Sequence, residues 1–175
     1  MKKVAIVGCG GAGKSTLARQ LGHILDLPVI HLDAEFWQPG WKMVSKEEEL
    51  RLIQKIISQQ TWIIDGNYSS TMNLRLADAD TIIFLDFSTL LCLWRVLKRR
   101  IKYWGKSRPD MNPGCLEKID WSFFWWILTF RAIQRPRVLQ SIDIYAAGRN
   151  VLIFERPRQV EQFLETLAPP TRQFN

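Results

Sequence analysis

Short apolar runs alternate with amphipathic segments along this chain. Five of the runs are brief and almost wholly apolar, which is typical of strands buried on both faces of a sheet. They cover residues 3–7, 29–32, 62–65, 81–86 and 151–154. Because helical segments separate these strands, the pattern predicts an α/β fold with an open parallel sheet and helices on both faces.

The amphipathic segments predict the helices and one long loop. Helices are expected from Lys14, after a capping box at Ser45, over about 90–103, from about residue 120, and before the C-terminal tail. Pro136 lies inside the fourth segment, where we expect it to kink or break the helix because proline removes a backbone N–H. Residues 104–118 predict a loop, and residues 171–175 a frayed tail.

Length and composition are those of one globular domain covering residues 1–175. The net charge of +7 favours anionic partners, which include nucleotides, nucleic acid and a membrane surface. The three cysteines form no C-x-x-C pair, which suits a reducing compartment. The apolar runs are too short for a signal peptide or a membrane span, so we expect a cytoplasmic protein with no membrane partner.

The stretch GCGGAGKS follows the first predicted strand and opens the first predicted helix. Its spacing is that of a loop whose backbone N–H groups and helix dipole hold nucleotide phosphates, although a glycine-rich turn without a ligand is the alternative. With ATP bound, Lys14 would reach the β- and γ-phosphates and Ser15 would ligate Mg²⁺. The predicted nucleotide-binding residues are Gly8, Gly10, Gly11, Ala12, Gly13, Lys14, Ser15 and Thr16.

Carboxylates follow the next three predicted strands. They are expected at the sheet edge where residues 8–15, the phosphate loop, also lie. Asp65 is expected to hold Mg²⁺ through water, and Asp33 to bind the substrate or accept its proton. Asp86 is expected either to cap the following helix or to take part in metal binding or proton transfer. His31 is expected to pack against its neighbours rather than to act in catalysis. The nearby aromatic residues could stack on a planar substrate or belong to the core; they are Phe36, Trp37, Trp41 and Tyr68.

Seven basic residues and no acidic residue occupy positions 95–108, and three arginines follow at 131, 135 and 137. One interpretation is a lid over about residues 100–135, in which arginines such as Arg99 and Arg131 neutralise charge during phosphoryl transfer. A second is a surface for nucleic acid, because a basic amphipathic helix can follow phosphates. The third is a solvated helix face.

Several segments together resemble a bacterial family, the DNA topology modulation or FlaR-related proteins, and more broadly adenylate kinase and shikimate kinase. They are GCGGAGKST, HLDAEFWQPGW, WIIDGNYSST, TIIFLDF, LCLWRVLKRR and RPDM. The resemblance implies a P-loop NTPase three-layer sandwich with a five-stranded parallel sheet and a helical lid, similar to adenylate kinase. It does not imply topoisomerase chemistry, since no motif for cutting DNA is present.

One departure from adenylate kinase bears on the phosphate acceptor. That enzyme follows its Asp-Gly with a proline and an arginine that grips a nucleotide phosphate, whereas Asn67, Tyr68 and Ser69 follow Asp65-Gly66 here. A hydroxyl acceptor needs a carboxylate to take its proton, and Asp33 supplies one. Arg75 is a candidate cation for the opposite case, an acceptor that is already ionised.

The sequence thus predicts an ATP- and Mg²⁺-dependent phosphotransferase acting on an unidentified small molecule. The candidate catalytic residues are Lys14, Asp33, Arg99 and Arg131, and the candidate metal ligands are Ser15 and Asp65. By analogy with kinases of this fold, residues 155–158 are expected to border the adenine. The alternative is a nucleotide-dependent regulator that binds DNA through the basic helices.

Overall fold

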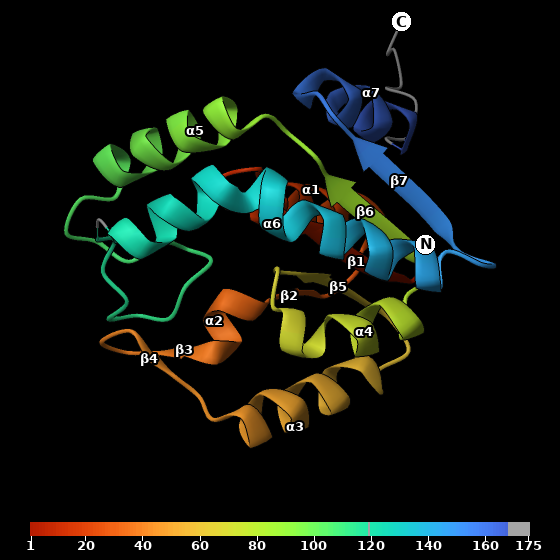
Figure 1. Cartoon of the computed structure of the whole chain (residues 1–175). Helices are drawn as coiled ribbons and strands as arrows, with labels where there is room; N and C mark the ends of the chain where they lie inside the picture. Colours follow the sequence, from red (N-terminus) through yellow and green to blue (C-terminus); the bar gives the residue numbers. More distant parts are fainter. Residues whose placement is uncertain (119, 168–175) are drawn as a thin grey trace, which may run out of the picture.

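A computed structural model describes residues 1–118 and 120–167, and its centre is a five-stranded sheet (Figure 1). All neighbouring strands of this sheet pair in parallel, in the order β2-β5-β1-β6-β7. The predicted parallel sheet is therefore confirmed. Its strands are β1 (Lys3–Gly8), β2 (Val29–His31), β5 (Trp62–Asp65), β6 (Thr81–Leu85) and β7 (Asn150–Phe154).

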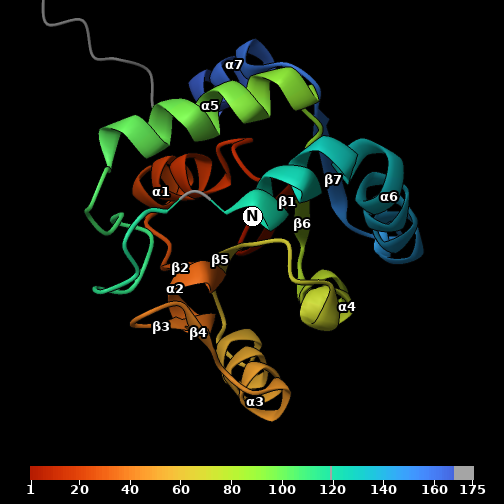
Figure 2. The same ribbon diagram turned by 60° about the vertical axis from the view of Figure 1, so that its left-hand side comes forward.

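Helices cover both faces of the sheet and complete a three-layer arrangement (Figure 2). The described helices are α1 (Lys14–Leu25), α2 (Leu32–Phe36), α3 (Lys46–Ile57), α4 (Ser69–Asp78), α5 (Thr89–Lys102), α6 (Trp121–Tyr145) and α7 (Pro157–Leu167). Helices α1 and α7 contact each other on one side, whereas α4 packs against α3 and α6 on the other. Helix α5 lies beside α6.

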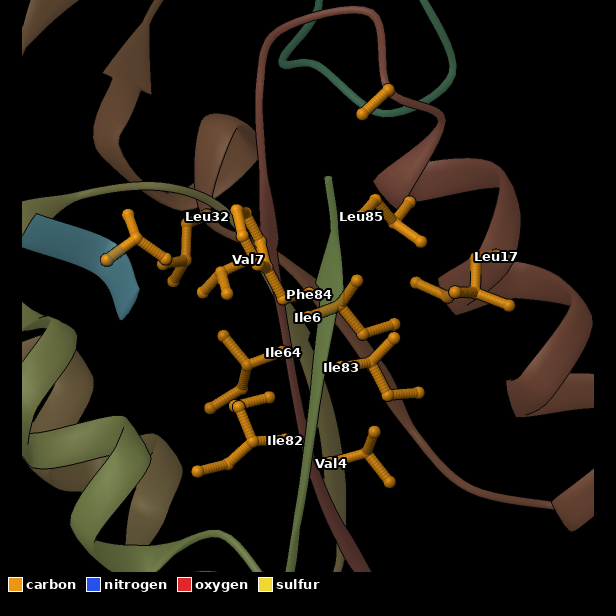
Figure 3. Close-up of a cluster of buried hydrophobic side chains, with 14 of the residues drawn as sticks. Val4, Ile6, Val7, Leu17, Leu32, Ile64, Ile82, Ile83, Phe84 and Leu85 are labelled. Carbon is orange, nitrogen blue, oxygen red and sulfur yellow. The ribbon is translucent and has the colours of Figure 1, made fainter. Parts of the chain in front are cut away.

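The core explains why the strands read as continuous apolar runs. Figure 3 shows Ile83 on the side of α1 and Leu17, while Ile82 and Ile64 point to the opposite side. These side chains are fully or almost fully buried. A strand covered on both faces must be apolar at every position, and this fixes the sheet between two helical layers.

The structure differs from the predicted elements after the second and third predicted strands. The second strand ends at His31, and Leu32 already begins the short helix α2, which carries Asp33. A small antiparallel pair follows, β3 (Trp37–Gln38) with β4 (Lys42–Met43), and α4 has no counterpart in the predicted elements. The tail expected at residues 171–175 lies outside the described residues.

The expected break at Pro136 is wrong, because α6 continues through this residue for 25 residues in all. Proline removes the hydrogen bond to the carbonyl four residues earlier, but both halves of the helix are anchored in the core. Ile127 and Phe130 are buried before the proline, and Val138 and Ile142 after it. Tertiary packing therefore overrides the local preference. In the described part of the chain, no helix is both long and apolar enough to cross a bilayer.

Candidate active site

The loop between β1 and α1 is held against two other helices. A Cβ at Gly11, where φ is +81°, would lie 2.3 Å from the carbonyl oxygen of Cys92 on α5. A Cβ at Gly10 would lie 2.5 Å from the ring of Phe123 on α6. Only glycine allows this close approach, and the loop leads directly into the N-terminus of α1. The geometry is that of an anion cradle bordered by α5 and α6.

Two cations border this cradle. The Lys14 ammonium donates to the carbonyls of Gly8 and Cys9 at 3.0 and 3.1 Å. The Arg95 guanidinium on α5 donates to the carbonyl of Ala12 at 2.9 Å. Arg95 belongs to the basic face seen in the sequence, but its contact with the loop depends on how α5 packs and could not be found from spacing alone.

Ser15 and Asp65 meet at the edge of the sheet. The Ser15 hydroxyl donates to Oδ2 of the buried Asp65 carboxylate at 2.8 Å, and Nδ1 of His31 pairs with Oδ1 of the same carboxylate. Residues 31 and 65 are directly paired in the register of β2 and β5. Burial lowers the pKa of His31, but the hydrogen bond to Asp65 and its charge outweigh burial, so the pKa lies above its ordinary value.

Asp33 lies in the first turn of α2, with nearly half of its side chain exposed. Its Oδ1 accepts a hydrogen bond of 2.7 Å from the Tyr68 hydroxyl, which in turn accepts one of 2.9 Å from Nε1 of Trp37. Burial, together with the Asp33 charge, raises the pKa of Tyr68, so the phenol keeps its proton. The aromatic residues are thus divided: Phe36 is core, whereas Trp37, Trp41 and Tyr68 line the cleft described below.

The segment 104–118 brings a buried arginine to this site. Arg108 lies 3.1 Å from Asp110, 2.9 Å from Glu117 and 3.9 Å from Asp33. Arg99 of α5 donates to the other oxygen of Glu117 at 3.1 Å. The two arginines share one buried carboxylate, and this cluster ties the segment to α5 and to α2. In the sequence, Arg108 is one of seven basic residues at positions 95–108 and opens the RPDM segment, but its contact with Asp33 was not predicted.

Asp110 completes the polar end of the site. Burial would raise the pKa of Asp110, but the Arg108 charge lowers it, and the Ser15 hydroxyl and the His31 charge act in the same direction. The net pKa is below its ordinary value, so Asp110 is a carboxylate beside Ser15. Asp110 lies in the RPDM segment that the sequence analysis quotes, but no role was predicted for it, because only the fold of the segment 104–118 brings it to Ser15.

These groups line one cleft of about 1,170 Å³. Its polar wall is formed by the phosphate loop, Asp33, Asp65 and Arg108, and the inner face of α5 adds Lys98, Arg99 and Lys102. Its apolar wall is formed by Phe123, Trp126, Val160 and Leu164. Pro157, from the expected adenine border at 155–158, also lines the cleft. A mixed lining of this kind suits a ligand with a charged end and a planar end.

Three residues that the sequence analysis considered for the site are not among those that line the cleft. Arg131 is about half exposed, lies 3.5 Å from Asp86 and is not among the residues that line the cleft. Asp86 is not a helix cap: it is buried and pairs with Arg135, while Ser88 caps α5. Arg75 is fully buried and donates to the carbonyls of residues 66 and 68, which removes it as a cation for the acceptor.

The side-chain oxygens at this site suit magnesium better than a metal ion that is coordinated entirely by protein side chains. No group of three or more His, Cys, Asp or Glu side chains that could hold a metal occurs among residues 1–118 and 120–167. Magnesium is usually held by one or two protein oxygens together with phosphate oxygens and water. The Ser15 hydroxyl and the Asp65 carboxylate, 2.8 Å apart, are hard oxygen groups of the type that magnesium binds.

The chain matches no protein-family model and no curated protein sequence. Its fold is nevertheless similar to solved kinases. Shikimate kinase from Acinetobacter baumannii in complex with shikimate aligns with a TM-score of 0.58 at 13% identity, over 95% of this chain and 90% of that chain. Shikimate kinase from Bacteroides thetaiotaomicron aligns with a TM-score of 0.50 at 16% identity, over 94% of each chain.

A nucleoside kinase also aligns. Deoxyadenosine kinase from M. mycoides, with products dCMP and a flexible dCDP bound, gives a TM-score of 0.51 at 16% identity, over 94% of this chain and 95% of that chain. At these identities the likeness concerns the fold. The chain has the P-loop NTPase fold that these kinases share.

Proposed function

We propose that this protein is a phosphotransferase that uses ATP and Mg²⁺ to phosphorylate a hydroxyl group of a small molecule. The observation that carries the proposal is the position of Asp33. Its partly exposed carboxylate opens into the cleft that the phosphate loop also lines. Transfer of a phosphoryl group to a hydroxyl requires a site for the nucleotide phosphates and a base for the hydroxyl proton, and one cleft offers candidates for both.

The nucleotide is proposed to lie along the cleft with its phosphates in the loop formed by residues 8–16. The N-terminus of α1 and the Lys14 ammonium favour negative charge there. The planar base would then reach the apolar wall near Pro157 and Val160. This orientation agrees with the expectation that residues 155–158 border the adenine.

Ser15 and Asp65 are proposed to hold Mg²⁺. The ion, when bound, neutralises charge on the β- and γ-phosphates. The protein's part is to aim the two oxygens, and here Asp65 is fixed by Ser15 on one side and His31 on the other. Buried Arg75 adds positive charge near Asp65.

The transfer step follows from Asp33. The acceptor oxygen forms a bond to the γ-phosphorus, the bond from that phosphorus to the departing ADP oxygen breaks, and the hydroxyl proton passes to Asp33. Lys14, Arg95 and Arg99 border the cleft and are proposed to stabilise the transferred group. The same role for Arg131, expected from the sequence, also stays a prediction. A lid over about residues 100–135 is proposed from the way Arg108 ties the segment 104–118 to Asp33.

The alternative function is a nucleotide-dependent regulator that binds DNA. It was suggested by the basic helices and by the sequence resemblance to DNA topology modulation proteins. The position of the basic face of α5 favours the kinase. Lys98, Arg99 and Lys102 line the cleft, so the face that would follow DNA phosphates is directed toward the nucleotide site.

The test is ADP release from ATP and Mg²⁺ across nucleosides, nucleoside monophosphates, sugars and cyclic alcohols, with duplex DNA as a further sample. We expect stimulation by a hydroxyl acceptor, loss of turnover in Lys14→Ala, and low turnover with normal ATP affinity in Asp33→Asn. The matched control is Glu35→Gln, an exposed carboxylate on the same short helix. Stimulation by DNA alone, or full turnover in Asp33→Asn, would contradict the proposal.

A further inference from the structure

Helix α5 is amphipathic, but its apolar face is turned to solvent. Leu90, Trp94 and Ile101 are 79%, 62% and 77% exposed, and Leu97 between them is exposed as well. These four residues are called the α5 stripe. Large apolar side chains aligned on one helix face are normally directed to the core. No described part of the chain covers the α5 stripe.

Two arginines of the basic face of α5 are held by contacts with other parts of the molecule. Arg95 donates to the phosphate loop, and Arg99 donates to Glu117. Lys98 and Lys102 line the cleft. The site therefore needs the basic face for itself, which explains why the helix has this orientation. With this orientation, however, no contact within the described part of the chain explains why the α5 stripe is apolar.

Helix α6, which packs against α5, carries a second exposed series. Trp121 is 77% exposed, and Trp125 and Leu128 are also exposed; these three form the α6 stripe. The two helices pack against each other, and both views show them side by side (Figures 1 and 2). Trp104, just beyond the end of α5, is exposed too, with the Arg100 guanidinium stacked on its ring at 4.6 Å.

The spacing within the stripes is that of helices that pack against helices. The α5 stripe has intervals of four, three and four residues, and the α6 stripe has intervals of four and three. This is the a and d spacing whose side chains insert between those of a facing helix. The lipid-facing alternative would place Lys and Arg on the exposed side to meet anionic head groups, whereas Arg95 and Arg99 of α5 are held by contacts on the cleft side.

The exposed area is also that of an interface between proteins. Together the residues of the two stripes and Trp104, which are 42–79% exposed, present on the order of 1,000 Å² of apolar surface. A stable dimer buries about 800 Å² on each partner. Tryptophan is moreover among the residues enriched in the centres of such interfaces.

We propose that a second copy of this chain docks on the α5 and α6 stripes, so that two α5–α6 pairs pack face to face about a two-fold axis. An isologous contact of this kind covers the same patch on both copies and leaves no open end. It also holds α5 from outside while Arg95 and Arg99 hold it from inside. The proposal does not depend on the proposed activity, since it rests on residues of the outer surface.

Sedimentation equilibrium of the wild-type chain, from low to high micromolar concentration, tests the proposal. We expect a dimer in the wild type and its loss in the double variant Trp94→Glu/Ile101→Glu. The matched control is Ile144→Glu, an exposed apolar residue on α6 outside both stripes, which should stay dimeric. Because the altered side chains are exposed, circular dichroism should show the same helical content in all three proteins.

Three results would overturn the proposal. The first is a wild-type chain that stays monomeric at high micromolar concentration. The second is a double variant that is correctly folded and still dimeric. The third is a monomeric wild type that sediments with vesicles of anionic lipid and loses this property in the double variant, which would assign the stripes to a membrane surface instead. The wild-type measurement alone keeps the test valid if the double variant fails to fold.

Discussion

The hydroxyl of Tyr68 donates a 2.7 Å hydrogen bond to Oδ1 of Asp33. The two residues come from different parts of the chain, one from the segment after β5 and the other from α2 after β2. Because Trp37 donates to the same hydroxyl, Asp33 is held by a chain of two hydrogen bonds that begins at an indole. The position of the proposed base is thus set by an aromatic pair.

Tyr68→Phe removes this support without changing the ring. The Trp37 indole N–H loses its acceptor and Asp33 loses a donor, so we expect the free energy of unfolding to fall by about 1–3 kcal/mol. Turnover should fall while the affinity for ATP stays the same. Urea unfolding and steady-state kinetics measure the two effects. Unchanged turnover would show that Asp33 needs no positioning by Tyr68.

Gly11→Ala tests the closeness of the phosphate loop to α5. The new Cβ would lie 2.3 Å from the Cys92 carbonyl at a positive φ, so the loop or the helix must shift. We expect a loss of about 2–4 kcal/mol in stability and a large loss of nucleotide affinity. The control is Gly148→Ala, where φ is +73° and nothing lies within 4 Å. It should cost only about 1–2 kcal/mol and leave nucleotide binding intact.

His31→Asn tests the pair between His31 and Asp65 through pH. The pKa of His31 is raised in the folded chain, so the charged pair adds stability below about pH 6.5, the unfolded value. This contribution is lost as pH rises through the folded pKa. The melting temperature of the wild type should therefore exceed that of His31→Asn most near pH 6, and the difference should shrink toward pH 9. A difference that grows with pH would contradict the pairing.

Arg75→Ala tests the structural role assigned to this fully buried residue. Burial lowers the pKa of Arg75 to about 10, so it stays charged at neutral pH, and it holds the carbonyls of Gly66 and Tyr68. Its removal should cost about 2–4 kcal/mol, because these acceptors lose charged donors inside the core. The control is Arg51→Ala, whose exposed ion pair with Glu48 is worth at most about 1 kcal/mol. Equal midpoints in urea for both variants would refute this role.

The sequence by itself determined the sheet and the nucleotide loop. Strands buried on both faces must be apolar throughout, and the loop needs glycines followed by Lys14 and Ser15, so both leave a local pattern. The same reasoning placed Asp33 and Asp65 at one edge of the sheet, because the carboxyl ends of parallel strands meet there. Of the kink or break expected at Pro136, the break is wrong, because packing on both sides of the proline outweighs a local preference.

Only the tertiary structure decided how the rest of the site is assembled. Whether a basic residue faces the cleft, another carboxylate or solvent depends on contacts between segments far apart in the chain, and spacing does not encode them. Arg95 and Arg108 reach the site, whereas Arg75 is buried below it and Arg131 pairs with Asp86. The orientation of α5 is the clearest case. Its two faces are plain in the sequence, but which of them turns inward was decided by the phosphate loop and by Glu117, which need its arginines.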